Sequence, residues 1–384
     1  MESPPGQAWL RKWASPVALS LAALIISFGQ RPFKLYNDTR IELVTAPGRF
    51  LGRIPDLWTS TIDLGHIQSS QFIGFLFPQG PVFALGDSAG IPLWIVQRFW
   101  FSALLAFAGY GVVRMIEAML SERLRGAGFL AGLLYICSPF VMISLNRGSV
   151  WLVPYAALPW ALLWTKRGIE NPHSWKAPAV LALLLAFTAN ATVALVAWVL
   201  VAMALLAAFE AVTGRRVRAV FGFAWRSALL SSLAALWWII PTFAQAKYGT
   251  DYLTFTEHAE AILRTPSASE SLRLLGYWVG YIKVFPGNGA QVPAIGSYLA
   301  SPLVIASSFI VPFLAIASLS IMRRWRYGAF FGLMLAFAVI AMSAGFPKET
   351  FAGRAVYDFY YAAGPLQFIR TTYKAAPLAG LALV

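Results

Sequence analysis

The chain has 384 residues, of which 59% are hydrophobic and 12% are charged. A soluble domain carries about 25% charged residues, so this much apolar surface cannot be enclosed in one soluble core and must face lipid. The net charge of +14 would suggest a nucleic-acid partner in a soluble protein. Here many of the basic residues lie in short segments between apolar runs, which favours a membrane protein with a basic cytoplasmic face and no nucleic-acid partner.

Apolar runs long enough to cross a bilayer, about 17 to 25 residues, follow one another along the chain. The first, residues 14–29, follows Arg11 and Lys12 and precedes no small-x-small cleavage site, so it predicts an uncleaved helix with a cytoplasmic N-terminus. Residues 177–209 are too long for one span, and Asn190 marks the expected break between two helices. The other predicted spans are 92–113, 129–145, 150–164, 228–243, 302–322, 328–344 and a tenth that begins near residue 375.

The basic residues give these spans a direction. The segments predicted to face the cytoplasm are short and hold half of the 30 lysines and arginines, whereas the outer segments are longer and more dilute in basic charge. The predicted cytoplasmic set is Arg11, Lys12, Arg114, Arg123, Arg125, Lys166, Arg167, Lys176, Arg215, Arg216, Arg218, Arg226, Arg323, Arg324 and Arg326.

The sequence therefore predicts an all-α, polytopic transmembrane helical bundle that forms one domain over residues 1–384. Its long outer loops are expected at 31–90, 244–301 and 346–374, with short interfacial helices. Because the chain ends within an apolar run, we expect either the membrane part of a longer protein or a shortened chain.

The outer loops combine aromatic residues with a few charges, and loops of this length are uncommon without a function. Sugars offer apolar faces to aromatic rings and hydroxyl groups to carboxylates. Such an arrangement predicts a sugar site, although interfacial aromatics with solvated charges are the plainer alternative. The residues predicted to bind acceptor or sugar are Glu42, Trp58, Glu257, His258 and Glu260.

Asp38 lies shortly after the first predicted span, at the outer interface. A carboxylate there could act as the general base that deprotonates an acceptor hydroxyl. The alternative is that Asp38 caps a short helix, since Asn37, Asp38 and Thr39 all have side chains suited to capping.

Four cations are candidates for binding a lipid phosphate. Arg370 and Lys374 stand four residues apart, which on a helix puts both on one face; snorkelling at a helix end is the alternative. Arg98 lies inside an apolar run, where an arginine indicates a functional site by default, and Arg147 lies in a tight outer turn.

No phosphate-binding glycine loop and no catalytic serine or cysteine signature is present. The single cysteine excludes an intrachain disulfide, and three scattered histidines give no zinc pattern, so no metal is predicted. Energy for a reaction would have to come from an activated lipid-linked donor or from an ion gradient.

The layout resembles the GT-C superfamily of membrane glycosyltransferases. The segments KLYNDTR at 34–40, NRGS at 146–149 with residues 154–160, and FIRTTYK at 368–374 are similar to the N-terminal membrane region of the actinobacterial α-(1→3)-arabinofuranosyltransferase family. The resemblance implies a bacterial plasma-membrane enzyme with decaprenylphosphoryl arabinose as donor, cell-wall arabinan as acceptor and Asp38 at the family's acidic position. Family members are far longer and carry outer carbohydrate-binding modules that this chain lacks.

Two alternatives remain. One is a related transferase that moves mannose or another sugar. The other is a transporter or flippase, which would place polar residues on broken helices at the bilayer midplane. Acids are nearly absent from the predicted midplane, Asn190 marks the one broken-helix candidate, and charges gather in the outer loops, which favours the enzyme.

Overall fold

The computed structural model describes residues 5–36, 40–60, 64–67, 73–120, 125–145, 148–188, 193–249, 259–282, 293–321, 325–362 and 370–384. In these ranges the regular secondary structure is helical apart from one antiparallel ribbon, in which β1 (Trp58–Thr59) pairs with β2 (His66–Ile67). The helices of the first half are α1 Pro5–Phe28, α2 Ile41–Thr45, α3 Pro47–Arg53, α5 Gln79–Ser88, α6 Leu93–Met119, α7 Arg125–Ile136, α8 Pro139–Ser144, α9 Ser149–Glu170 and α10 Lys176–Thr188. The second half has α11 Val193–Thr213, α12 Val217–Tyr248, α13 Ala259–Leu263, α14 Ala268–Leu272, η3 Trp278–Tyr281, α15 Pro293–Ala300, α16 Pro302–Ser308, α17 Ile310–Ile321, α18 Arg326–Ser343, α19 Phe351–Ala362, η5 Thr372–Ala375 and α20 Ala376–Ala382.

The all-α, polytopic prediction is confirmed. Within the described ranges, six helices are long and apolar enough to cross a membrane, and two more are apolar but shorter. The six are Leu93–Met119, Gly126–Ser144, Val193–Thr213, Val217–Tyr248, Pro302–Ile321 and Arg326–Ser343; the shorter two are Ala14–Phe28 and Lys176–Thr188.

Helix α12 extends well beyond the predicted span 228–243, so the expectation that Arg218 and Arg226 lie in a loop is wrong. No helix breaker separates these arginines from the apolar run, and a long side chain can reach polar partners from within a helix. The Arg226 guanidinium does so: it donates to the carbonyl of Pro172 and lies 5.3 Å from the ring centroid of Trp175.

The predicted span 129–145 is divided into α7 and α8 at Ser138–Pro139. Pro139 opens α8, where its missing N–H costs nothing, and Ser138 caps the helix by accepting a hydrogen bond from the Val141 amide at 3.4 Å. The Tyr135 ring stacks on Tyr155 of α9 with centroids 4.0 Å apart, so the break is packed firmly against its neighbour.

Helices α1, α6, α7 and α9 form the centre of the bundle. Helix α7 runs antiparallel to α6, and the two backbones lie in close contact. A Cβ atom added at Gly132 would lie only 2.7 Å from the carbonyl oxygen of Gly109. On another face of α6, a Cβ atom at Gly111 would lie 2.5 Å from the indole nitrogen of Trp160. Backbones approach this closely only where the side chains are hydrogen atoms.

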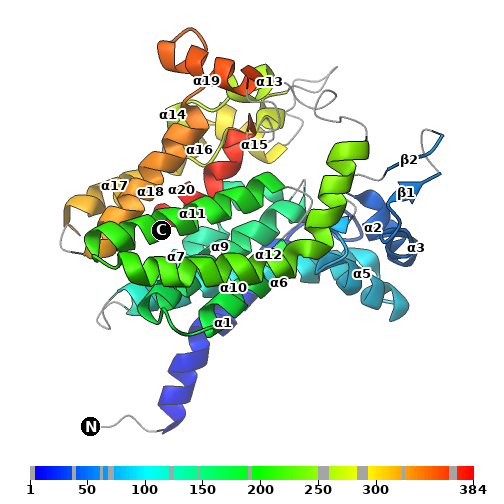
Figure 1. The fold of residues 1–384 in the computed structure, drawn as a ribbon, viewed down its shortest axis with the longest axis horizontal. Helices are drawn as coiled ribbons and strands as arrows, with labels where there is room; N and C mark the ends of the chain where they lie inside the picture. Colours follow the sequence, from blue (N-terminus) through cyan, green and yellow to red (C-terminus); the bar gives the residue numbers. More distant parts are fainter. Residues whose placement is uncertain are drawn as a thin grey trace.

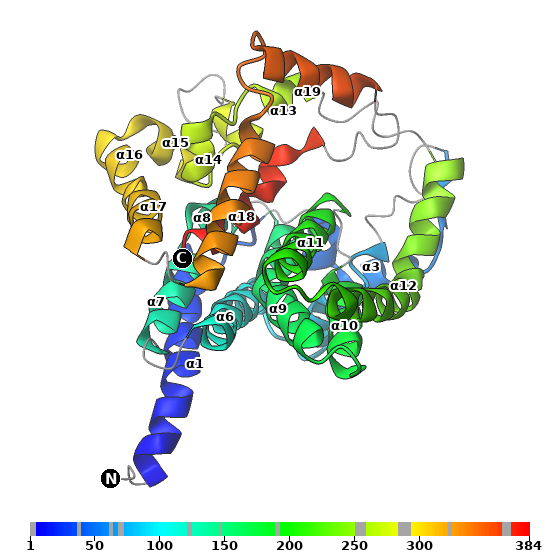
Figure 2. The same cartoon turned by 60° about the vertical axis from the view of Figure 1, so that its left-hand side comes forward.

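The two ends of the bundle differ. We call the end where α1 finishes and α6 and α9 begin the loop-bearing end, and the opposite end, with Arg114, Lys166 and Arg326, the basic end. In Figures 1 and 2 helices α13 and α19 lie at the top, whereas the N-terminus lies at the bottom. At the basic end, buried Glu210 of α11 accepts hydrogen bonds from Arg326 at 2.8 Å and from Tyr327 at 2.7 Å, which joins α11 to α18.

The glycine contact generates a first prediction. Gly132→Ala forces α7 away from α6, and overpacking of this kind should lower the free energy of unfolding by about 1–3 kcal/mol. Gly126→Ala is the matched control on the same helix, because nothing lies within 4 Å of its added Cβ. Alanine is the better helix former, so the control should be neutral or slightly stabilising. Thermal unfolding of the purified variants in detergent tests this, and equal stability of the two would contradict it.

Candidate functional site

The segment that carries Asp38 is anchored on its N-terminal side by Gln97 of α6. The Tyr36 amide donates to Gln97 Oε1 at 2.9 Å, and Gln97 Nε2 donates to the Tyr36 carbonyl at 3.1 Å. Asp38 itself lies outside the described residues. It follows Tyr36 by two residues, so the covalent chain keeps their Cα atoms within about 8 Å of each other.

On its C-terminal side the same segment leads into α2, which is pinned by the fully buried side chains of Leu43 and Val44. Burial lowers the pKa of Arg40, which immediately precedes α2, and the nearby Glu42 carboxylate opposes that shift. Glu42 is exposed and accepts a hydrogen bond from Arg53 of α3 at 2.8 Å. Both flanks of residues 37–39 are therefore fixed to the bundle.

Arg98 lies in the second turn of α6 and is fully buried. Its Nη2 donates to the carbonyl of Lys34 at 3.0 Å, and the guanidinium carbon lies 4.2 Å from the centroid of the Tyr36 ring. Its Nη1 has no hydrogen-bond partner in the described part of the chain. An unpaired buried donor costs about 1–3 kcal/mol, so an anion that accepts from Nη1 would be favoured here.

A second group of side chains joins the second and third outer segments to α9. Trp151 of α9, Tyr277 and Tyr373 of η5 surround one another, with centroid distances of 4.6, 5.3 and 6.1 Å. Arg370, three residues before Tyr373 in the sequence, is also buried. The Lys374 amine lies 5.9 Å from the Tyr373 ring centroid. This cluster lies where α9 begins, at the loop-bearing end.

The expectation that Arg370 and Lys374 share one face of an α-helix is wrong. Lys374 lies in the 3-10 helix η5, whereas Thr371, with ψ of 60°, leaves the helical region between them. The two cations are close along the chain, but helical spacing does not align them.

The remaining predicted residues are spread over the loops. Arg147, Glu257 and His258 lie outside the described residues, and Glu260 lies on α13 with only its backbone described. Trp58 is 59% exposed on β1, where its ring covers Gly65. In the described ranges, no group of three or more histidine, cysteine, aspartate or glutamate side chains gathers in metal-binding geometry.

Two features of this end were not predicted from the sequence. Gln97 is one uncharged polar residue in an apolar run, and only its position next to Arg98 could have drawn attention to it. The aromatic cluster unites residues that are 96 or more positions apart, and no local pattern indicates such a contact.

The role of Gln97 can be tested by Gln97→Leu, which keeps the approximate shape but leaves the amide and carbonyl of Tyr36 unpaired. We expect the free energy of unfolding to fall by about 1–3 kcal/mol. Ala103→Leu, at an exposed position of the same helix, is the control and should be neutral. Denaturant unfolding followed by tryptophan fluorescence measures both, and an unaffected Gln97→Leu variant would show that Tyr36 is held by other contacts.

Comparison with known proteins gives a consistent result. The sequence matches the family described as alpha-(1->3)-arabinofuranosyltransferase, N-terminal GT-C domain, over residues 22–384. Proteins named alpha-(1->3)-arabinofuranosyltransferase from Mycolicibacterium smegmatis and Mycobacterium tuberculosis are each 28% identical, over 76% and 78% of this chain. The chain spans only about a fifth of their length, 20% and 21%. A cryo-EM structure of the arabinofuranosyltransferase AftD from mycobacteria has the same fold, with a TM-score of 0.70 at 21% identity over 97% of this chain and 24% of that one.

Proposed function

The chain belongs to the family of α-(1→3)-arabinofuranosyltransferase N-terminal GT-C domains, and from that membership we propose that it is a membrane glycosyltransferase. It moves arabinofuranose from a polyprenyl-phosphate donor, decaprenylphosphoryl arabinose, to a cell-wall polysaccharide. The observation that carries the proposal is the double anchoring of the Asp38 segment, by Gln97 on one side and by the buried face of α2 on the other. Catalysis requires such fixed placement of a base.

Asp38 is the proposed general base. Its carboxylate takes the proton of the acceptor hydroxyl as the hydroxyl oxygen attacks the anomeric carbon of the donor. The bond from that carbon to the phosphate oxygen breaks, and polyprenyl phosphate leaves with the bonding electrons. The reaction needs no nucleotide, in agreement with the absence of a nucleotide-binding motif from the sequence.

The donor phosphate is assigned to Arg98, Arg147, Arg370 and Lys374. Support is strongest for Arg98, because its buried Nη1 lacks an acceptor in the described ranges and its Nη2 is already fixed to Lys34. A preorganised guanidinium binds phosphate without a further cost for ordering the side chain. The aromatic cluster of Trp151, Tyr277 and Tyr373 offers ring faces on which a sugar could pack, together with Glu42, Trp58, Glu257, His258 and Glu260 in the loops.

We further propose that the loop-bearing end faces outward from a bacterial plasma membrane and that the N-terminus is cytoplasmic. The support is the concentration of arginine and lysine at the basic end, which the positive-inside rule places in the cytoplasm. Lipid-linked donor and polysaccharide acceptor then meet at the outer face.

The orientation can be measured by cysteine labelling in intact cells. In a Cys137→Ala background, which removes the single native cysteine, Ser269→Cys on α14 should react with a membrane-impermeant maleimide. Val217→Cys at the start of α12 should react only after the cells are opened. Both positions are exposed, so a difference reports their side of the membrane; labelling of residue 217 from outside would reverse the orientation.

The base can be tested by Asp38→Asn, which preserves shape and most capping ability but cannot accept the proton. General-base catalysis contributes about 10²- to 10⁴-fold, so transfer of labelled arabinose to a synthetic arabinan should fall by at least about 100-fold, with donor binding retained. Asp87→Asn, at an exposed position at the end of α5, is the matched control and should remain active. Near-parental transfer by Asp38→Asn would assign Asp38 to capping. A parent protein that uses only another lipid-linked sugar would favour the mannosyl-type alternative, and donor movement without transfer would favour a flippase.

A further inference from the structure

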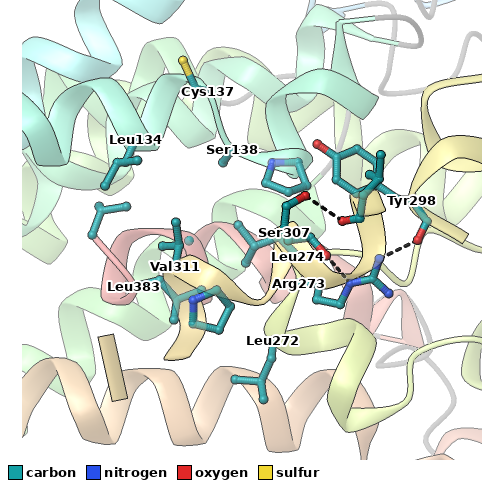
Figure 3. Close-up of a pocket in the computed structure, with 16 residues that line it drawn as sticks. Leu134, Cys137, Ser138, Leu272, Arg273, Leu274, Tyr298, Ser307, Val311 and Leu383 are labelled. Atoms are coloured by element: carbon teal, nitrogen blue, oxygen red, sulfur yellow. Dashed lines mark hydrogen bonds between the residues drawn. The ribbon is translucent and has the colours of Figure 1, made fainter. Parts of the chain in front are cut away.

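A cavity of about 240 Å³ lies between α7–α8, the segment after α14, α15, α16–α17 and α20. Its lining is unevenly divided (Figure 3). Arg273, Ser307 and Tyr298 lie at one side, whereas Leu134, Val311 and Leu383 lie at the other. The cavity therefore has a polar end with a positive charge and an apolar end.

Arg273 is a buried cation without a counter-ion among the described residues. It is only 6% exposed, and no carboxylate in those ranges forms an ion pair with it. Its Nε donates to Ser308 Oγ at 2.6 Å, its Nη2 donates to the carbonyl of Tyr298, and its guanidinium lies 5.2 Å from the Phe309 ring centroid. Glu270, one turn earlier, accepts from the hydroxyl of Ser267 at 3.3 Å instead.

Neutral acceptors such as a hydroxyl and a carbonyl oxygen satisfy the hydrogen-bond donors of the Arg273 guanidinium but do not balance its positive charge. A charge buried away from water is costly unless an opposite charge lies near it. An anion at the polar end of the cavity would supply that charge.

The cavity lies within the bundle at a depth that lipids reach. Ser307 and Val311 belong to the first half of the candidate span Pro302–Ile321, counted from the loop-bearing end. Ser138 belongs to the corresponding half of Gly126–Ser144, and Leu134 lies next to the middle of that span. The wall formed by α16 and α17 is the most exposed of the candidate spans, with 6% of its apolar window buried, so this side of the cavity borders lipid.

The cavity is also distinct from the part of the candidate site that holds the Asp38 segment and Arg98. In both overall views α16 and α17 lie on the left, and α3, which follows the Asp38 segment, lies on the right (Figures 1 and 2). None of the residues that line the cavity contacts Tyr36, Gln97 or Arg98 through any hydrogen bond or ring contact described above.

We propose that this cavity binds an anionic membrane lipid, with its phosphate at Arg273 and Ser307 and part of one hydrocarbon chain between Leu134, Val311 and Leu383. The volume is below the roughly 300–1,000 Å³ of sites that enclose a whole small molecule, so only part of the chain enters and the remainder stays in the bilayer. The site goes beyond the proposed transfer reaction and does not depend on it.

The test measures lipid retention by the purified full-length protein with native mass spectrometry, after exchange into detergent with one lipid at a time. The probes are phosphatidylglycerol, a polyprenyl monophosphate and zwitterionic phosphatidylcholine. Retention of an anionic lipid should exceed that of phosphatidylcholine by about tenfold or more, the effect of one charge-assisted hydrogen bond. Retention of phosphatidylglycerol would identify a bilayer phospholipid as the source, and retention of the polyprenyl phosphate alone would identify a lipid carrier.

Variants locate the binding. Val311→Trp fills the apolar end without touching the hydrogen bonds of Arg273 and should abolish retention. Ala317→Trp, exposed on the same helix, should retain lipid as the parent does. Arg273→Gln should remove the preference for anionic lipids, and Val311→Trp keeps the proposal testable if Arg273→Gln does not fold. Equal retention of all three probes, or unchanged retention by Val311→Trp, would overturn the proposal; arabinosyl transfer is not the readout, so the result is independent of Asp38.

Discussion

The close approach of α6 to its neighbours is the contact on which the candidate site depends. Gly109 meets the backbone of α7, and the backbone of α6 at Gly111 meets the Trp160 side chain of α9, so α6 is positioned by close contacts at its glycines. Helices in lipid gain little from hydrophobic burial and rely on such packing. Gln97 and Arg98 of the same helix bond to Tyr36 and Lys34. The glycine contacts that position α6 therefore also determine where the first outer segment lies.

Two buried charged side chains, one at each end of the bundle, differ in how completely they are paired. At the basic end, the Glu210 carboxylate forms an ion pair with Arg326 and accepts a hydrogen bond from the Tyr327 hydroxyl, so its charge is balanced within the protein. At the loop-bearing end, Arg98 Nη1 and the Thr372 hydroxyl are buried without partners in the described part of the chain. A buried carboxylate that is fully paired, such as Glu210, suits a structural joint. A buried guanidinium nitrogen without an acceptor, such as Arg98 Nη1, suits a place where a ligand supplies the missing partner.

Hydropathy predicts the six helices that are long and apolar enough to cross the membrane, because lipid requires long apolar helices whatever their partners. The break predicted at Asn190 lies outside the described residues, between the described ends of α10 and α11. Helix α12 is longer than its apolar run predicts, because Arg226 reaches polar partners from within the helix. The clamp by Gln97 and the meeting of Trp151 with Tyr277 and Tyr373 could not be predicted, since both depend on which helices become neighbours. The burial of Arg273 could not be predicted either, because α15 and α16 create it.

Helix α12 also makes the protein sensitive to the thickness of its membrane. Its 32 residues extend for about 48 Å at 1.5 Å per residue, against a hydrocarbon core of about 30 Å. Arg226 donates to the Pro172 carbonyl and packs on two tryptophan rings. These contacts fix the depth of the first part of α12 in the membrane, so the helix cannot slide along its axis in a bilayer of different thickness. A thinner bilayer must then tilt α12 or bend it at Pro241, and the displacement appears at Tyr248, where the second outer segment begins. A change in bilayer thickness therefore changes the position of the second outer segment through the tilt or bend of α12.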